Sequence, residues 1–121
     1  TNVALCAIQS AIYMSLLGRQ GLQDLANLVF QKAEFARQEI GKIKGVEVKR
    51  SSPTFNEFTV RLPQPALDVI AKMIKQGFAA GFPLSRYYPG MENYLLIAVT
   101  EKRTKGEIVQ FAKALEKVLW N

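Results

Sequence analysis

The first seventeen residues form an almost continuous apolar helix pattern, which a 121-residue domain has little surface to cover. Between Val3 and Leu17 only three positions are polar, and they do not form a continuous polar stripe. The run is shorter than the roughly 20 apolar residues that span a bilayer. It also lacks the basic start and the small-residue cleavage site of a signal peptide. We therefore expect this helix to be covered by protein that lies outside the sequence.

This expectation divides the chain into two parts. Residues 1–17 are expected to link to a missing large domain, and residues 18–121 are expected to form a small α+β domain. Without its usual cover, the Val3–Leu17 helix should either fold back on the sheet or pair with another copy of the chain.

Composition narrows the possible functions. The chain is 49% hydrophobic and 21% charged, as expected of one soluble globular domain. It has no histidine, the commonest general base and transition-metal ligand, so we expect no metal site. Its one cysteine, Cys6, lies in the apolar helix and is interpreted as a buried small hydrophobe in a reducing compartment, the cytoplasm. The net charge of +6 leaves a basic nucleic-acid-binding module as an alternative, although a solvated basic surface is favoured.

The next stretch predicts a helix and a hairpin. From Leu22 to Ile43, apolar residues are spaced alternately by four and three, which indicates a helix with Gly45 as its stop. The period then changes to two, which predicts strands at Val46–Lys49 and Glu57–Leu62. A loop at Ser51–Thr54 would join them.

The rest of the chain predicts two helices around an inner strand. Pro63 and Pro65 open a helix that runs to about Gln76, and its inward residues are expected to be Leu67, Ile70, Met73 and Ile74. The segment 78–90 is irregular, with room for a short strand and a tight turn at Pro89 and Gly90. Residues 94–99 are continuously apolar, which predicts a strand covered on both faces. Thr104 and Glu107 form a capping box for the last helix. The order predicts an α+β fold, a two-layer sandwich of a small, mostly antiparallel sheet backed by helices.

Residues that could carry chemistry are few. The chain has no phosphate-binding glycine loop and no histidine to activate a serine or cysteine, so covalent catalysis by this chain alone is not expected. Arg86 and Tyr88 lie in the irregular segment, where an arginine can form paired hydrogen bonds with a carboxylate or phosphate beside an aromatic wall. Asn56 precedes one strand and Glu101 follows another, where substrate-facing groups are often displayed. The structural alternatives are packed tyrosines, a solvated arginine, and a glutamate that pairs or caps a helix.

Five short groups of residues, in chain order, resemble the C-terminal part of subunit 1 of glycine dehydrogenase (decarboxylating), the P-protein family of the glycine cleavage system. The groups are Asn2, Ala4, Leu5 and Cys6; Gln31, Lys32 and Ala33; Phe55, Asn56, Glu57 and Phe58 with Arg61, Leu62 and Pro63; Arg86, Tyr87, Tyr88 and Pro89 with Glu92 and Asn93; and Thr100, Glu101, Lys102, Arg103 and Thr104. Each group is weak alone, but their succession along the whole chain is specific.

The resemblance implies the small domain of a fold type I enzyme that uses pyridoxal phosphate. That family, an oxidoreductase of bacterial glycine catabolism, decarboxylates glycine and passes the aminomethyl group to the lipoyl group of H-protein. The resemblance also implies that the cofactor is held by subunit 2, through a histidine–lysine motif that this chain lacks. The fragment is therefore expected to be a non-catalytic scaffold without a cofactor, in which Arg86, Tyr88, Asn56 and Glu101 are candidates by position to reach the substrate. A small domain from another fold type I enzyme, such as an aminotransferase, is a further alternative.

Overall fold

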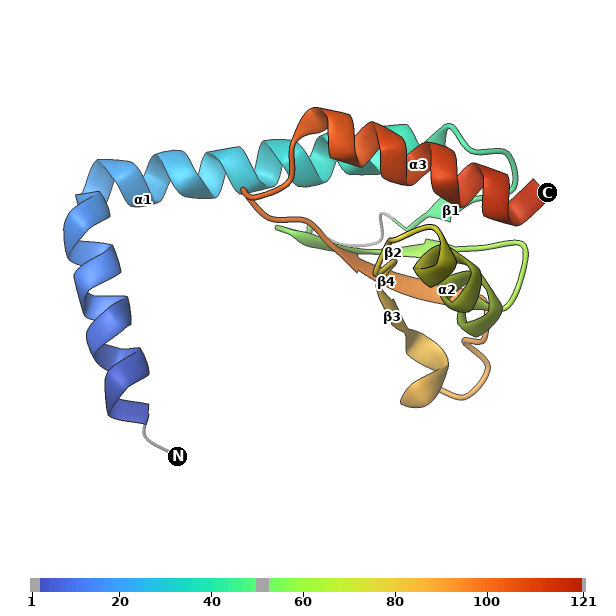
Figure 1. Ribbon diagram of the computed structural model, residues 1–121, viewed down its shortest axis with the longest axis horizontal. Helices are drawn as coiled ribbons and strands as arrows, with labels where there is room; N and C mark the ends of the chain where they lie inside the picture. The colour runs from blue at the N-terminus through green and yellow to red at the C-terminus, as the bar shows by residue number, and fades with distance from the viewer. Residues whose placement is uncertain (1–2, 50–52, 121) are drawn as a thin grey trace.

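The computed structural model describes residues 3–49 and 53–120. The chain folds into helices and a small sheet, with the C-terminus at one end of the molecule and the N-terminal segment projecting from the other (Figure 1). In order, the elements are α1 (Val3–Gly41), β1 (Glu47–Val48), β2 (Glu57–Arg61), α2 (Ala66–Lys75), β3 (Phe82–Pro83), the 3₁₀ helix η1 (Leu84–Arg86), β4 (Tyr94–Ala98) and α3 (Lys105–Trp120).

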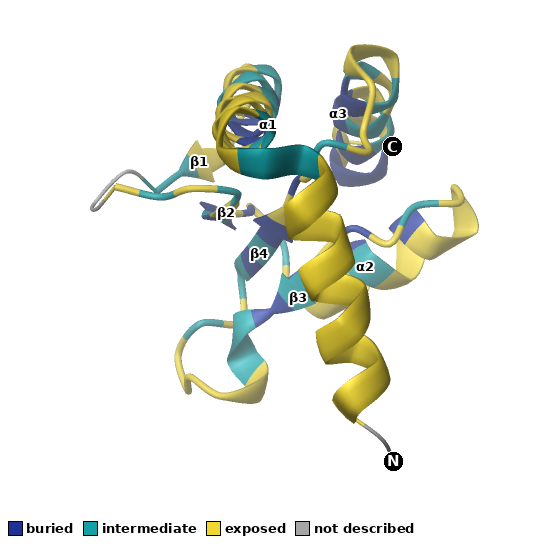
Figure 2. Ribbon diagram, turned by 90° about the vertical axis from the view of Figure 1, so that its left-hand side faces the viewer, coloured by how far each residue is buried: buried dark blue, intermediate teal, exposed yellow. Residues whose placement is uncertain are grey.

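The four strands form one antiparallel sheet in the order β1-β2-β4-β3. The pairing of Glu47 with Arg61 confirms the predicted β1–β2 hairpin, although Ser51 and Ser52 of the predicted loop lie outside the described residues. The second part of α1, after its bend, lies with α2 and α3 on one face of the sheet (Figure 2). The predicted two-layer α+β sandwich is therefore confirmed.

The predicted seam of the helix before β1 is only partly buried. Val29, Ala33, Ala36, Ile40 and Ile43 are buried, as their spacing predicts. Leu22 and Ala26 are exposed, because α3 and the sheet cover α1 only from about Val29 onward. The helix ends at Gly41, and Gly45, with a φ of 78°, forms the turn that follows it instead of the helix stop. That part of the prediction was wrong.

The predicted inward face of α2 is also partly wrong. Met73 is buried as expected, but Leu67 and Ile74 are 55% and 62% exposed. The buried face consists of Ala66, Val69 and Met73. The backbone amide of Ala66 donates a hydrogen bond of 2.8 Å to the carbonyl of Glu92, and this anchor fixes which side of the helix faces the core.

Strand β4 is covered on one face rather than on both. It is an inner strand, paired with β2 on one side and β3 on the other. Leu95, Ile97 and Val99 are buried, whereas Leu96 is half-buried and Ala98 is exposed. The reason is that the helices all lie on the same face, which leaves the other face of the sheet open.

The N-terminal segment Val3–Leu17 leaves the body of the protein at a sharp bend (Figure 1). At Gly18 the backbone has a φ of 62° and a ψ of −174°, a combination that only glycine adopts readily. Beyond the bend the segment is exposed along its length (Figure 2), and Leu5 and Ile8 are 61% and 57% exposed. The expectation that it folds back on the sheet was wrong, and so was the expected burial of Cys6, which is exposed.

Candidate functional site

The four predicted site residues lie at opposite ends of the sheet. Asn56 precedes β2 and Glu101 follows β4, and these ends meet because the amide of Val99 donates to the carbonyl of Asn56 at 2.9 Å. Strand β3 runs antiparallel to β4, so Arg86 and Tyr88, which follow it, lie near the beginning of β4. The structure therefore does not bring the four residues into one cluster.

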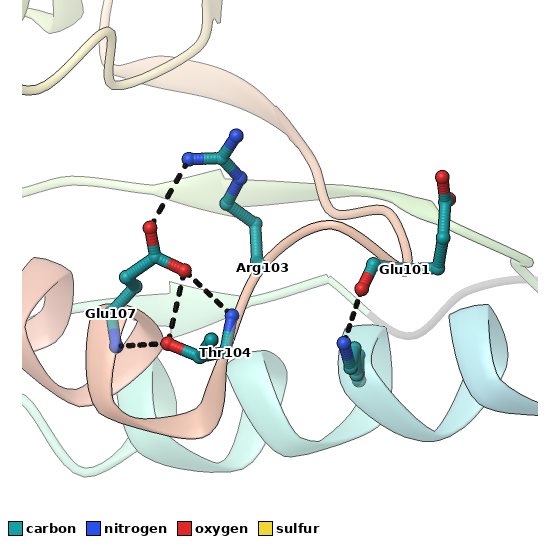
Figure 3. A network of polar contacts seen from close by, with 5 residues as sticks. Glu101, Arg103, Thr104 and Glu107 are labelled. Atoms are coloured by element: carbon teal, nitrogen blue, oxygen red, sulfur yellow. Dashed lines mark hydrogen bonds and ion pairs between the residues drawn. The ribbon is translucent and has the colours of Figure 1, made fainter.

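At the first end, Glu101 contributes its backbone to the fold. The Nζ of Lys32 in α1 donates a hydrogen bond to the carbonyl oxygen of Glu101, which ties the turn after β4 to the long helix (Figure 3). The Glu101 carboxylate points away from Thr104 and Glu107. It makes no hydrogen bond or ion pair with another residue of the described chain, so neither predicted structural alternative, pairing or capping, applies to this side chain.

The residue that caps the N-terminus of α3 is Glu107, together with Thr104. Its carboxylate accepts hydrogen bonds from the amide of Thr104 at 2.7 Å and from the Thr104 hydroxyl at 3.0 Å, and its own amide donates to that hydroxyl at 3.2 Å. This arrangement confirms the predicted capping box (Figure 3). The Thr104 amide first, and then its hydroxyl, hold the pKa of Glu107 below its ordinary value, because both bonds favour the charged carboxylate.

The segment before Asn56 is held by a buried charge that the sequence did not reveal. Arg37 on α1 is 5% exposed. Its guanidinium donates to the carboxylate of Glu34 at 2.8 Å and to the hydroxyl of Thr54. Arg37 lies next to the buried residue Ala36 in α1, so its burial depends on where the segment that contains Thr54 packs. The helix pattern alone does not reveal that position. Arg37 fixes the approach to β2, and hence the position of Asn56.

At the second end, Arg86 is part of an aromatic stack. Its guanidinium carbon lies 5.7 Å from the centroid of the Phe82 ring, and Phe82 stacks with Tyr87 at 5.7 Å with an interplanar angle of 18°. Arg86 is exposed and makes no ion pair with the rest of the described chain. An arginine oriented by a ring, with unused N–H donors, is suited to a planar anion such as a carboxylate. Sequence reasoning missed Phe82, because β3 is too short for its alternation to be read.

Tyr88 lies outside this stack and begins the predicted tight turn. The amide of Met91 donates to the carbonyl of Tyr88 at 3.2 Å, and Gly90 has a φ of 86°, as a type II turn with proline before glycine requires. The carboxylate of Glu92 accepts a hydrogen bond from the amide of Gly90 at 3.1 Å. Tyr88 is 57% exposed, so its hydroxyl is accessible to a ligand or to another chain.

A groove of about 790 Å³ runs along the edge of β4 beyond β3. Its walls include the small residues of segment 77–81, the rings of Phe82 and Phe111, and the polar side chains of Arg103 and Glu107. None of the four predicted site residues lines it. The groove reaches the end of the sheet near Asn56 and Glu101, because Glu57 and Thr100 line it, but it does not extend to Arg86 and Tyr88.

Two further properties limit the chemistry of the described residues. Within 3–49 and 53–120, no three side chains of the metal-binding types come together in a way that could hold a metal ion. Over the same residues, every helix is too short or too polar to cross a membrane.

Comparison with known proteins gives a consistent result. A family profile described as Glycine cleavage system P-protein matches residues 1–115. Curated relatives named probable glycine dehydrogenase (decarboxylating) subunit 1 include those of Geotalea daltonii, 46% identical, and Geotalea uraniireducens, 48% identical, each over 98% of this chain. The chain spans 27% of the length of these relatives.

Comparison with solved structures points to the same family. A glycine decarboxylase (P-protein) of the glycine cleavage system, crystallised in inhibitor-bound form, superposes with a TM-score of 0.89 and 31% identity over 98% of this chain and 27% of its own. MppP soaked with the product 2-ketoarginine shares the fold at a TM-score of 0.68, with 13% identity over 90% of this chain and 31% of its own.

Proposed function

This chain belongs to the glycine cleavage system P-protein family, and we propose that it is the C-terminal small domain of subunit 1 of a glycine-decarboxylating enzyme. This proposal rests on the extent of the match. Nearly the whole chain aligns with relatives of that name, and it covers about a quarter of the length of each relative. In this role the domain is a scaffold and an interface of a fold type I enzyme. Residues 1–17 connect it to a large domain, and residues 18–121 form the small domain itself.

The residues of this chain do not fit pyridoxal phosphate, which we assign to subunit 2 of the complete enzyme. A cofactor-binding lysine needs a desolvated amine. Among the described lysines only Lys32 and Lys49 are half-buried, and the others are exposed. Lys32 donates to the Glu101 carbonyl and Lys49 donates to Glu47 at 2.7 Å. At the start of α3, where a phosphate could otherwise bind, the carboxylate of Glu107 already occupies the amide of Thr104.

Of the candidate site residues, Arg86 and Tyr88 are the pair that we place toward the substrate. Asn56 and Glu101 lie at the other end of the sheet, so a single active site facing one end would not include both pairs. Arg86 has the stronger case, because Phe82 orients its guanidinium while its donors are unused within the described chain. In the complete enzyme it would bind the carboxylate of glycine or hold the loop that covers it.

Subunit 2 and the lipoyl-carrying H-protein are the partners that this function requires, in the bacterial cytoplasm. The exposed apolar segment Val3–Leu17 supports an interface with another body of protein, because an apolar surface of this extent is seldom left in water. In this chain alone, the same segment would pair with a second copy.

Activity tests this proposal. Purified chain should give no exchange between labelled bicarbonate and the carboxyl group of glycine, with or without added pyridoxal phosphate, whereas the complete two-subunit enzyme should give exchange. In the complete enzyme, Arg86→Ala should raise the KM for glycine by about tenfold or more, as loss of a charge-assisted hydrogen bond predicts. The matched change Arg19→Ala, at an exposed arginine of α1, should leave KM unchanged. Exchange catalysed by the isolated chain would refute the scaffold role.

Self-association has its own test. Sedimentation velocity of the chain should show a dimer at micromolar concentration, and Leu5→Gln together with Ile12→Gln should shift it to monomer, because both residues are exposed on the projecting segment. Leu67→Gln with Ile74→Gln, two exposed apolar residues of α2, provides the control and should leave the dimer intact. A chain that stays monomeric at high concentration would contradict the pairing.

A further inference from the structure

A second groove, of about 530 Å³, lies at the end of the molecule that holds the C-terminus (Figure 1). It forms where the turn after α1 meets the last turns of α3. Its lining residues are Lys44, Lys113, Glu116, Lys117 and Trp120. The family match ends at residue 115, so three of the five lining residues lie beyond the part of the chain that the family profile covers.

Trp120 is fixed in this groove although it is 53% exposed. A Cβ atom added to Gly45 would come within 3.1 Å of the Trp120 ring, so the indole packs directly on the glycine turn. Gly45 also has a φ of 78°, which other residues adopt rarely. The ring therefore has one side packed and the other side open, as an aromatic anchor of an interface would have.

The groove carries positive charge that is not neutralised by ion pairs within the described chain. It contains three lysines and one glutamate, in a chain whose net charge is +6. Lys44, Lys113 and Lys117 are exposed, and none forms an ion pair with another residue of the described chain. Charged groups that surround an anchoring aromatic ring commonly select a partner of opposite charge.

We propose that this groove binds an acidic segment of a partner protein. Carboxylates of the segment pair with Lys44, Lys113 and Lys117, and an apolar side chain of the segment packs on the open side of Trp120. A protein segment is favoured over nucleic acid because binding of a nucleic-acid strand relies on several stacking rings along a longer basic track, whereas this groove has one ring and three lysines.

The test uses the 121-residue chain and a fluorescein-labelled hexapeptide, Glu-Glu-Leu-Glu-Glu-Leu. Binding should change the anisotropy of the label and the fluorescence of Trp120, which is the single tryptophan of the chain. Affinity should fall as salt is raised, and the peptide Gln-Gln-Leu-Gln-Gln-Leu should bind about tenfold more weakly or not at all. An oligothymidine of similar length should compete less well than the unlabelled acidic peptide.

Variants localise the binding. Lys113→Glu with Lys117→Glu should weaken the acidic peptide by about tenfold or more. Lys75→Glu with Lys102→Glu makes the same change of net charge at exposed lysines outside the groove, and should change affinity by less than about twofold. Trp120→Ala should weaken binding without removing its salt dependence. Equal losses in the two lysine pairs, equal binding of the glutamine peptide, or tighter binding of the oligothymidine would each overturn the proposal.

Discussion

The guanidinium of Arg37 lies over the ring of Phe58, with its central carbon 5.1 Å from the ring centroid. This contact joins the buried face of α1 to the middle of the sheet, because Phe58 is itself 1% exposed in strand β2. The same guanidinium donates to Glu34 and Thr54. One side chain thus connects the long helix, the sheet and the segment that leads into Asn56.

Removal of this connection should destabilise the chain. Arg37→Ala should lower the free energy of unfolding by about 2 kcal/mol, because it removes a buried guanidinium that bonds Glu34 and Thr54 and packs over Phe58. Denaturation by urea, followed by circular dichroism, measures the change. Arg19→Ala, at an exposed arginine of the same helix, should change it by less than about 0.5 kcal/mol. If the two variants were equally stable, Arg37 would not hold the fold together.

The capping box should make stability depend on pH. Bonds from Thr104 lower the pKa of Glu107 in the folded chain, so this carboxylate adds stability above its unfolded-state pKa of about 4.3 and loses it as the pH falls through the lower folded-state value. Glu107→Gln keeps a capping box but cannot titrate. The difference in unfolding free energy between the two chains should therefore be larger at about pH 6 than at about pH 3. A difference that is the same at both pH values would contradict this.

Local signals in the sequence predicted local structure well. The Thr104–Glu107 box, the alternation of Phe58 and Val60, and the turn at Gly90 each depend on residues a few positions apart, and the structure confirms all three. The small antiparallel sheet with helices on one face followed from their order. What failed depends on distant contacts, such as the hydrogen bond from Ala66 to Glu92 that sets the orientation of α2.

That orientation can be tested directly. Met73→Ala should lower the free energy of unfolding by about 2–5 kcal/mol, because Met73 is fully buried and its removal leaves a cavity. Ile74→Ala, at the neighbouring position that the sequence placed inward, should cost less than about 0.5 kcal/mol because Ile74 is 62% exposed. Met73 belongs to both faces and sets the scale, so the cost of Ile74→Ala in chemical denaturation decides between them. If Ile74→Ala lost more unfolding free energy than Met73→Ala, the buried face of α2 would be the one expected from the sequence.

The candidate site was less predictable than the fold. A loop arginine flanked by tyrosines could be noticed in the sequence, and Arg86 does lie exposed in such a loop. Its orientation depends on Phe82, which the register of β3 brings beneath it. That Asn56 lies at the other end of the sheet also follows only from strand pairing, which no spacing along the chain revealed.

The bend at Gly18 should control the direction of the N-terminal segment. Gly18→Ala disfavours the backbone conformation of the bend, with its φ of 62°, and should let the two parts of α1 become one straight helix. Spin labels on Cys6 and on Lys113→Cys should then lie farther apart in electron–electron distance measurements. Gly106→Ala, within α3, should leave the distance unchanged. An unaltered distance in Gly18→Ala would mean that the bend has another cause.

Whether this chain holds a cofactor of its own is tested most directly by trapping pyridoxal phosphate on it. The purified chain is incubated with an equimolar amount, reduced with borohydride, digested and examined by mass spectrometry. A scaffold domain should show only scattered, substoichiometric labelling of its exposed lysines. Stoichiometric labelling of a single lysine, abolished when that residue is changed to arginine, would contradict the assignment of the cofactor to the partner subunit.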